Sequence, residues 1–303
     1  MVTGCTGYIG SNLCIELVRR GQEVLGVCPE RLHPVAQTLE KAGVLIYGGD
    51  LTRAETFEKL VRNIRIDSVQ TVYQMAGIHA SLPKMRELYV TGVKRLVSLF
   101  EDYPPPYFVF ASSGTVPFPN PEHLRYHPFG VINAEMERCI AQMHLHSAIV
   151  RIAEVYGWGK MNPFRHLNSG ISLLGDGKNI AAKIFIEDAV AMLLQISEIK
   201  PDGLFEMCDD LQVTQRTFYN YAEELAGCKF VNWTGDQDLA AENRLWQSIH
   251  GLRTLPIQMD NGALKRELQY KLRYPTYQSG LKDLYLQHIE RECNDTLEGL
   301  QKI

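Results

Sequence analysis

Three glycines near the start of the chain are spaced as in a loop that binds phosphate. The first residues read MVTGCTGYIGSNL, which places Gly4, Gly7 and Gly10 in the pattern T-G-x-x-G-x-x-G. Glycines at this spacing let the backbone pass close to a pyrophosphate, whose charge is stabilised by N–H groups at the start of the following helix. The pattern predicts a strand, a turn that binds a dinucleotide, and a helix. The predicted turn residues are Gly4, Thr6, Gly7, Tyr8, Ile9 and Gly10.

The strand that leads into this turn is short in the sequence. Only Met1 and Val2 precede the glycine pattern, whereas a typical strand has about five residues. We therefore expect the natural start of the chain to lie upstream of Met1.

The end of the second apolar run bears on the choice of cofactor. An acidic residue about 20 positions after the turn usually binds the adenosine ribose of NAD. Here Cys28 takes that place, and Glu30 and Arg31 follow. Because Arg31 could contact a 2′-phosphate, NADP is slightly favoured over NAD. Solvation of Glu30 and Arg31 without any ligand is an open alternative.

The turn needs a sheet to position it, and the sequence supplies the pattern for one. Short apolar runs alternate with helical periodicity, which is clear in residues 85–100 and 133–143. This alternation, with strands that are apolar throughout, predicts an α/β fold of the Rossmann type, a doubly wound parallel sheet buried on both faces. The predicted strands are EVLGVC, GVLIYGGD, SVQTVYQMAG, YFVFASS, SAIVRIAEVYG and LFEMCDD.

Segments without strand character interrupt this pattern after residue 157. We assign residues 1–157 and 180–200 to the dinucleotide-binding domain, and residues 158–179 and 201–303 to a smaller C-terminal substrate lobe. Inserts after the later strands of such a sheet usually lie over its carboxyl edge, where open α/β folds bind ligands.

The composition excludes several classes of protein. Of the 303 residues, 45% are hydrophobic and 22% are charged, as in ordinary globular domains. The net charge of -4 gives no reason to expect nucleic acid or a membrane surface as partner. No apolar run approaches the roughly 18 residues of a membrane span, and no signal peptide is visible. The 7 scattered cysteines form no C-x-x-C pair, so we expect a cytoplasmic protein without a metal site.

Six motifs together resemble the extended, atypical branch of the short-chain dehydrogenase/reductase superfamily, the NAD(P)-dependent epimerase/dehydratase proteins. They are TGCTGYIG, GGDLT, YQMAG, FVFASS, RIAEVYGWG and FIEDAV, in the order and spacing of that family. The likeness runs over nearly the whole chain and implies a nicotinamide dinucleotide as cofactor and a small molecule as substrate.

The resemblance also implies roles for individual residues. Asp50 and Leu51 would contact the adenine, and Ala76 and Gly77 would line the middle of the cofactor. Ser113 matches the serine or threonine that hydrogen-bonds the reacting oxygen. Members commonly form homodimers through two helices, which here would be residues 85–100 and 133–144.

The chain departs from the family where the proton is transferred. Family members use Tyr-x-x-x-Lys, in which the lysine lowers the pKa of the tyrosine. The segment PFGVINAEMER aligns Phe129 and Asn133 with these two places, and neither side chain can take part in that proton transfer. The one literal match, from Tyr156 to Lys160, contains two glycines and is read as a chance match. Tyr126 and, beside it, His127 could supply a substitute acid or could be plain loop residues.

Further substitutions disfavour a sugar-nucleotide substrate. Glu154 replaces an asparagine of the family and would repel a diphosphate if it faced the site, and Ala181 stands where many relatives have arginine. The main hypothesis is an atypical NAD(P)-dependent oxidoreductase, in which Ser113 and Tyr126 act on a small non-nucleotide carbonyl or hydroxyl compound. The alternative is a catalytically inactive dinucleotide-binding sensor or regulatory protein. A lyase or isomerase without the tyrosine and lysine also stays open.

Overall fold

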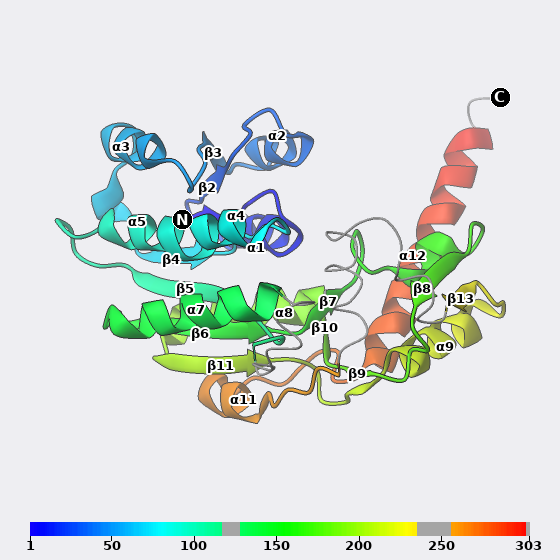
Figure 1. Cartoon of the computed structure of the whole chain (residues 1–303). Coiled ribbons are helices and arrows are strands. Elements are labelled where there is room, and N and C mark those ends of the chain that lie inside the picture. Colours follow the sequence, from blue (N-terminus) through cyan, green and yellow to red (C-terminus); the bar gives the residue numbers. More distant parts are fainter. Residues whose placement is uncertain (117–127, 235–255, 301–303) are drawn as a thin grey trace. The chain divides into compact units, whose positions relative to one another are not determined.

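The computed structural model describes residues 1–116, 128–234 and 256–300, which form two compact units (Figure 1). Unit 1 comprises Met1–Ile152, Ala189–Met207 and Asp260–Tyr270, and unit 2 comprises Ala153–Asp188, Cys208–Met259 and Lys271–Ile303. No helix in the described part of the chain combines the length and apolar character of a membrane span.

Unit 1 is built on a seven-stranded sheet in the order β11-β6-β5-β4-β1-β2-β3. Every pairing in this sheet is parallel. The predicted α/β fold with a Rossmann-type parallel sheet is therefore confirmed. The strands are β1 (Val2–Thr3), β2 (Leu25–Cys28), β3 (Leu45–Gly48), β4 (Thr71–Gln74), β5 (Tyr107–Ser113), β6 (Ser147–Ile152) and β11 (Gly203–Met207).

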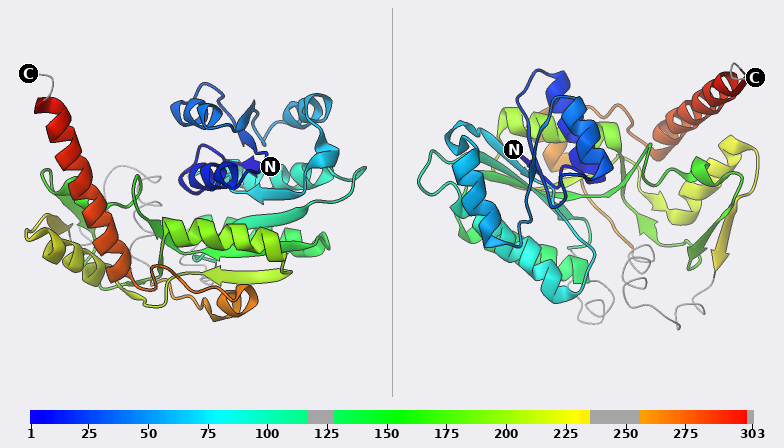
Figure 2. Two further views of the ribbon diagram at one scale, coloured as in Figure 1. Left: turned by 180° about the vertical axis from the view of Figure 1, so that it is seen from behind. Right: turned by 90° about the horizontal axis from the view of Figure 1, so that it is seen from above.

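Helices cover both faces of this sheet (Figure 2). Helices α1 (Tyr8–Arg19) and α8 (Ile186–Ile199) share one face, because Arg20 at the end of α1 pairs with Glu198 of α8 at 3.0 Å. The other face carries α3 (Ala54–Asn63), α4 (Leu82–Arg86), the π-helical segment η2 (Glu87–Gly92), α5 (Val93–Ser98) and α7 (Pro128–Gln142). Among the described residues, unit 1 also contains the helices α2 (Pro34–Lys41), η1 (Ile66–Ser68) and α11 (Gly262–Leu268).

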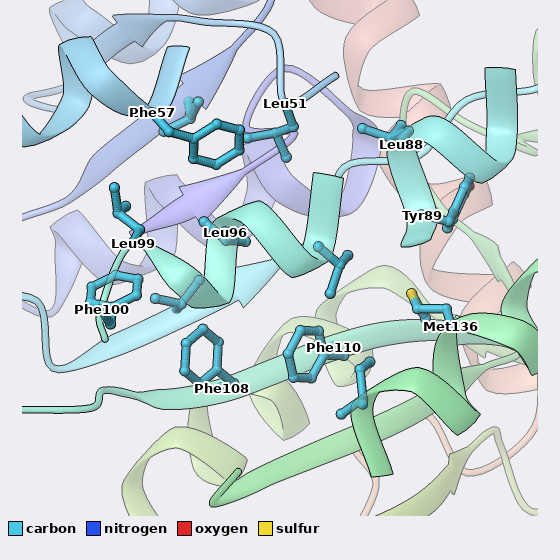
Figure 3. Close-up of a cluster of buried hydrophobic side chains, with 14 of the residues drawn as sticks. Leu51, Phe57, Leu88, Tyr89, Leu96, Leu99, Phe100, Phe108, Phe110 and Met136 are labelled. Atoms are coloured by element: carbon cyan, nitrogen blue, oxygen red, sulfur yellow. The ribbon is translucent and has the colours of Figure 1, made fainter. Parts of the chain in front are cut away.

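A large apolar cluster fixes these helices on the sheet. It joins side chains of α3, η2, α5 and α7 to Phe108 and Phe110 of β5, and Figure 3 shows several of them. Burying each such side chain stabilises the fold by about 1.5–3 kcal/mol. The predicted helix over residues 85–100 is found as α4, η2 and α5 in succession, with the π-helical turn in its middle.

Strand β11 corrects the assignment of residues 201–303 to the smaller lobe. Its residues pair with β6 over five positions, from Gly203 opposite Ala148 to Met207 opposite Ile152. A strand this apolar gains most by joining the buried sheet, so this part of the C-terminal region belongs to unit 1.

Unit 2 contains three two-stranded sheets and a second apolar cluster. Its core is rich in aromatic residues, among them Tyr156, Phe164, Phe218 and Tyr277. The elements are β7 (Glu154–Tyr156), η3 (Pro163–His166), β8 (Ile171–Leu174), β9 (Ile180–Ala181), β10 (Lys183–Phe185), β12 (Val213–Thr214), α9 (Gln215–Ala226), β13 (Val231–Thr234) and α12 (Tyr277–Leu300).

Candidate functional site

The glycine turn lies between β1 and α1, at the point where the strand order of the sheet reverses. Gly4 has φ +63°, and a Cβ added there would lie 2.6 Å from Cα of Ala76, after β4. A Cβ on Gly10 would lie 2.3 Å from the carbonyl oxygen of Gly4. Side chains are therefore excluded at both positions by the backbone itself. The carboxyl ends of β1 and β4 meet here, where doubly wound sheets bind ligands.

Gly7 differs from the other two glycines of the turn. Its backbone is extended, with φ -73° and ψ 165°, a conformation open to any residue. It is exposed, and an added Cβ would have one neighbour, the Gly4 carbonyl oxygen at 3.2 Å. Its φ and ψ therefore do not require glycine, but the contact with the Gly4 carbonyl oxygen is tight, and an added Cβ would shift the turn by a few tenths of an ångström. Space at Gly7 is what a closely approaching ligand requires.

The start of α1 suits a negatively charged ligand. Gly7 is the N-cap residue, no side chain caps the helix, and the first turn carries no acidic residue. The N-terminus of a helix favours anions because its N–H groups and dipole point toward them. The residues present therefore fit a pyrophosphate group beside Gly7, with Thr6 before the helix and Tyr8 and Ile9 in its first turn.

A buried polar network below the turn was missed from the sequence. The Thr3 hydroxyl donates to Oε1 of Gln74, and the Gln74 amide donates to the Ala76 carbonyl oxygen at 3.2 Å. The N–H of Ala76 points back to the Thr3 hydroxyl at 3.4 Å. A glutamine inside the apolar run TVYQMAG was the available signal, since buried polar side chains are nearly always hydrogen-bonded. The network holds Ala76 against Gly4.

Asp50 and Leu51 follow β3 and play different structural parts. Oδ1 of Asp50 accepts hydrogen bonds from the Thr52 N–H at 2.9 Å and the Thr52 hydroxyl at 2.8 Å. The side chain of Leu51 is buried in the core of unit 1, as Figure 3 shows. Asp50 thus shapes its own loop, and Leu51 has only its backbone to offer to an adenine ring.

The residues after β2 bear on discrimination between the two dinucleotides. Cys28 is buried, and its thiol contacts the Glu30 carbonyl oxygen. The exposed guanidinium of Arg31 pairs with Glu40 of α2 at 2.9 Å. A 2′-phosphate at this place would meet the Arg31 guanidinium, which is already paired with Glu40.

At the end of β5, Ser113 lies beside the start of α7. Its hydroxyl is 2.8 Å from the Thr115 hydroxyl and accepts from the Thr115 N–H at 3.2 Å. A Cβ on Gly130 would lie 2.7 Å from the Thr115 carbonyl oxygen, so the loop packs directly on α7. Ser113 is thereby held next to the helix turn that carries Phe129.

The neighbouring Ser112 belongs to a separate polar cluster that the sequence did not reveal. Its hydroxyl donates to Glu137 of α7 at 2.6 Å, and Glu137 accepts two bonds from Arg151 of β6, at 3.0 and 2.8 Å. Glu206 of β11 lies 3.5 Å from the same guanidinium. These contacts raise the pKa of Arg151. The cluster ties α7 to the sheet and so fixes the orientation of Phe129.

Phe129 and Asn133 lie one turn apart on α7. The Phe129 ring stacks on His79, with ring centroids 4.3 Å apart and planes 28° from parallel, and meets Tyr89 edge-on at 5.7 Å. Asn133 is buried, and its amide donates to the Phe129 carbonyl oxygen at 2.8 Å. Both side chains have packing and hydrogen-bonding partners within unit 1. The predicted substitute acid Tyr126, and His127 with it, lies outside the described residues.

In unit 2 the charge of Glu154 is neutralised. Lys183 is buried and donates to Glu154, and Gln215 bonds both side chains. The lysine also lies over the Phe218 ring, 4.4 Å from its centroid. The pairing with Lys183, 29 positions away in the sequence, reduces the repulsion that the Glu154 carboxylate was expected to exert on a diphosphate.

Tyr156 and Lys160 form no catalytic pair. Tyr156 ends β7 and is fully buried in unit 2, and the chain turns back after it through two hydrogen bonds between Gly157 and Lys160. A Cβ on Gly280 would lie 2.0 Å from the Tyr156 hydroxyl. Interpreting this match as accidental agrees with the strand-and-turn geometry.

Two acidic residues of unit 2 differ in the hydrogen bonding of their carboxyl groups. Asp188 accepts from the N–H groups of Arg273 and Tyr274 at 2.9 and 2.7 Å, a structural role. Asp209 is 2% exposed, and within the described residues its carboxyl oxygens have no hydrogen bond of ordinary geometry, with the Leu211 backbone as their main stabilising group. Burial raises the pKa of Asp209 to about 8, so the side chain is mainly protonated at neutral pH.

Comparison with known proteins agrees with this geometry. A model described as "NAD dependent epimerase/dehydratase family" matches residues 1–204. The UDP-glucose 4-epimerase of Klebsiella pneumoniae is 32% identical over 124 residues, 38% of this chain and 89% of that sequence. UDP-glucuronate 4-epimerase 1 of Arabidopsis thaliana is 28% identical over 127 residues, and that match covers 30% of the plant protein.

Solved structures share the fold over nearly the whole chain. The UDP-glucose 4-epimerase of Thermotoga maritima, with UDP-glucose, has a TM-score of 0.74 at 19% identity, covering 96% of this chain and 98% of that one. A tyrosine-to-phenylalanine mutant of UDP-glucuronic acid 4-epimerase from Bacillus cereus, in complex with a fluorinated substrate analogue and NAD, has a TM-score of 0.73 at 18% identity, covering 94% and 96%.

Proposed function

This chain belongs to the NAD-dependent epimerase/dehydratase family, and from that premise we propose that it binds a nicotinamide dinucleotide at the glycine turn. The observation that carries the proposal is Gly7. Its backbone conformation is ordinary and the residue is exposed, and its missing side chain leaves the space that a closely approaching pyrophosphate needs. The uncapped start of α1 beside it supplies the favourable field for the phosphates.

The preferred dinucleotide is NAD. Arg31 is the residue through which the sequence slightly favours NADP, and Glu40 neutralises it. To bind a 2′-phosphate, the guanidinium would have to leave Glu40, and the exposed carboxylate would then repel the phosphate. The Bacillus cereus relative that holds NAD supports the same choice.

The proposed activity is oxidoreduction of a small carbonyl or hydroxyl compound that carries no nucleotide. Two cations of unit 2 that could have met a diphosphate have partners within the protein. Lys183 is buried against Glu154, and Arg216 lies over the Trp233 ring while donating to the Asp176 carbonyl oxygen at 2.7 Å. The named relatives are sugar-nucleotide enzymes, so UDP-glucose and UDP-glucuronate belong in any substrate panel as the competing case.

When bound, the dinucleotide supplies or accepts hydride at the substrate carbon. The residues of this chain would orient the substrate oxygen and handle its proton. We assign to Ser113 the hydrogen bond to that oxygen, and its contacts with Thr115 at the end of β5 support this role. Phe129 and Asn133 can neither give nor take the proton, so this step falls to another group.

A second candidate function is a dinucleotide sensor without turnover. The packing of Phe129 and Asn133 favours it, since the ring is stacked and the amide is hydrogen-bonded inside unit 1. Such a protein would keep the binding turn and do no chemistry.

Calorimetric titration with NADH and NADPH, followed by a carbonyl panel, separates these functions. We expect binding of NADH that is tighter than binding of NADPH, and slow NADH oxidation with at least one carbonyl compound. Binding without turnover across the panel, nucleotide sugars included, would support the sensor. No binding of either dinucleotide by the folded chain would refute both.

A further inference from the structure

The group that replaces the missing tyrosine hydroxyl can be sought among the neighbours of Phe129. We propose that His79 transfers the proton to and from the substrate oxygen, an inference that rests on the proposed oxidoreductase function. Its imidazole covers the face of the Phe129 ring at a centroid distance of 4.3 Å, and the residue is exposed. An imidazole thus lies against the ring that took the place of the tyrosine.

The packing brings His79 to the same corner of unit 1 as Ser113. The loop after Ser113 presses on Gly130, where an added Cβ would be 2.7 Å from the Thr115 carbonyl oxygen. Gly130 is next to Phe129 on α7, and Phe129 carries His79 on its ring face. The ends of β4 and β5 and the start of α7 therefore converge on one place, which holds a hydroxyl and an imidazole.

The loop that carries His79 is held by aromatic contacts on two sides. Tyr89 of η2 lies against Gly77, where an added Cβ would be 2.5 Å from its hydroxyl, and its ring meets Phe129 at 5.7 Å. Phe129 then stacks on His79. Gly77 was predicted to let the chain approach the cofactor, and the same absence of a side chain lets Tyr89 support this loop.

Three titratable side chains on the neighbouring elements, Tyr89, Arg86 and Glu135, are unsuited to the task. Burial raises the pKa of Tyr89, so its hydroxyl keeps its proton well beyond neutral pH. Arg86 of α4 and Glu135 of α7 are engaged with each other through three hydrogen bonds of 2.9–3.0 Å. Histidine is the residue type here whose ordinary chemistry includes both giving and accepting a proton near pH 7.

The proton balance of the step is simple. Reduction of a carbonyl adds one hydride to the carbon and requires one proton at the oxygen, and a protonated imidazole N–H can give that proton. In the reverse direction, the neutral ring nitrogen takes the hydroxyl proton as hydride leaves the carbon. Ser113 donates a hydrogen bond to the oxygen and keeps its own proton.

The first test needs no turnover. The ring resonances of ¹⁵N-histidine are titrated against pH in the full chain, alone and with saturating NAD⁺ or NADH, and assigned to His79 with the His79→Phe variant. NAD⁺ carries a positive nicotinamide ring that NADH lacks, so a histidine beside it holds its proton less readily. We expect the midpoint of the His79 titration to lie lower with NAD⁺ than with NADH. Identical midpoints in both complexes would overturn the proposal.

The second test compares His79→Phe, which keeps a stacking ring, with His166→Phe in unit 2 as the matched control. We expect His79→Phe to bind NADH as the wild type does and to oxidise it about 10²–10⁴-fold more slowly with the best carbonyl compound of the panel. The control should keep the wild-type rate. A wild-type rate in His79→Phe would overturn the proposal while leaving the proposed function intact. Absence of NADH binding by the wild type would instead refute the proposed function, and His79 with it.

Discussion

The two ends of the candidate site in unit 1 differ in construction, because one depends on the backbone and the other on side chains. At the β1–α1 turn the geometry comes from the backbone, because Gly4 and Gly10 leave no room for side chains and Gly7 leaves room for a ligand. At the β5–α7 end the chemistry depends on single side chains, and the resemblance aligns Phe129 and Asn133 with the tyrosine and lysine of the family. Under the proposed function, binding and turnover are therefore separable, since a substitution at this end removes a proton donor and leaves the backbone of the turn unchanged.

The largest expected effect comes from rebuilding the proton-transfer pair. The double variant Phe129→Tyr/Asn133→Lys returns an ionisable hydroxyl and the cation that lowers its pKa. A positioned general acid contributes about 10²–10⁴-fold, so adding this pair to the His79→Phe variant, which lacks the proposed proton donor, should raise NADH oxidation by up to that factor. Steady-state rates with the best wild-type substrate measure it.

Phe129→Tyr alone is the control, because a hydroxyl without the lysine keeps its ordinary high pKa and should gain much less. If the folded variant that carries this pair binds NADH and shows no rate increase, the missing proton donor is not what limits turnover. The inactive sensor is then favoured.

The next largest effect is expected at the binding end. Gly7→Ala adds a methyl group where the pyrophosphate would lie, while its extended backbone suits alanine. Overpacking of about 1–3 kcal/mol corresponds to a loss of affinity for NADH of about 5- to 150-fold. Isothermal titration calorimetry measures the affinity, and thermal melting measures the separate cost of the 3.2 Å contact between the added Cβ and the Gly4 carbonyl oxygen.

Gly21→Ala is the control for Gly7→Ala. Gly21 ends the same helix with φ +75° and has nothing within 4 Å of an added Cβ, so alanine costs about 1–3 kcal/mol of backbone strain without touching a ligand. In Gly21→Ala the melting temperature should fall, and the affinity for NADH should stay at the wild-type value. An unchanged affinity in Gly7→Ala would show that the space at Gly7 is not used by the dinucleotide.

The smallest effect is expected at the adenosine end. Glu40→Gln frees Arg31 from its ion pair. An exposed pair of this kind is worth about 0.2–1 kcal/mol, so the ratio of NADPH to NADH affinity should rise by about 1.4- to fivefold. Competition titrations at low and high salt measure the ratio, and the gain should shrink at high salt. If the ratio of NADPH to NADH affinity is the same in Glu40→Gln as in the wild type, the 2′-phosphate does not lie near Arg31.

The sequence predicts the sheet and the glycine turn well because each depends on local features. Apolar runs and glycines at fixed spacing can be recognised without knowing the rest of the structure. Strands β2, β4 and β5 fall inside their predicted runs. Contacts between residues distant in sequence were not predictable in this way. Examples are the pairing of Lys183 with Glu154, which lie 29 positions apart, and the stacking of His79 on Phe129. Such contacts require the register of the strands and the packing of α7, which local periodicity does not contain.

Asp209 gives the protein a thermal signature that can be read in a calorimeter. Its folded pKa of about 8 stands far above the value of about 3.9 in an unfolded chain, so this group favours the folded state most strongly in acid. That contribution falls as pH rises from about 4 and is exhausted above about 8. Between pH 5 and 7, melting therefore liberates close to one proton from this carboxyl. Apparent melting enthalpies should then depend on the ionisation heat of the buffer, and Asp209→Asn should remove that part of the dependence.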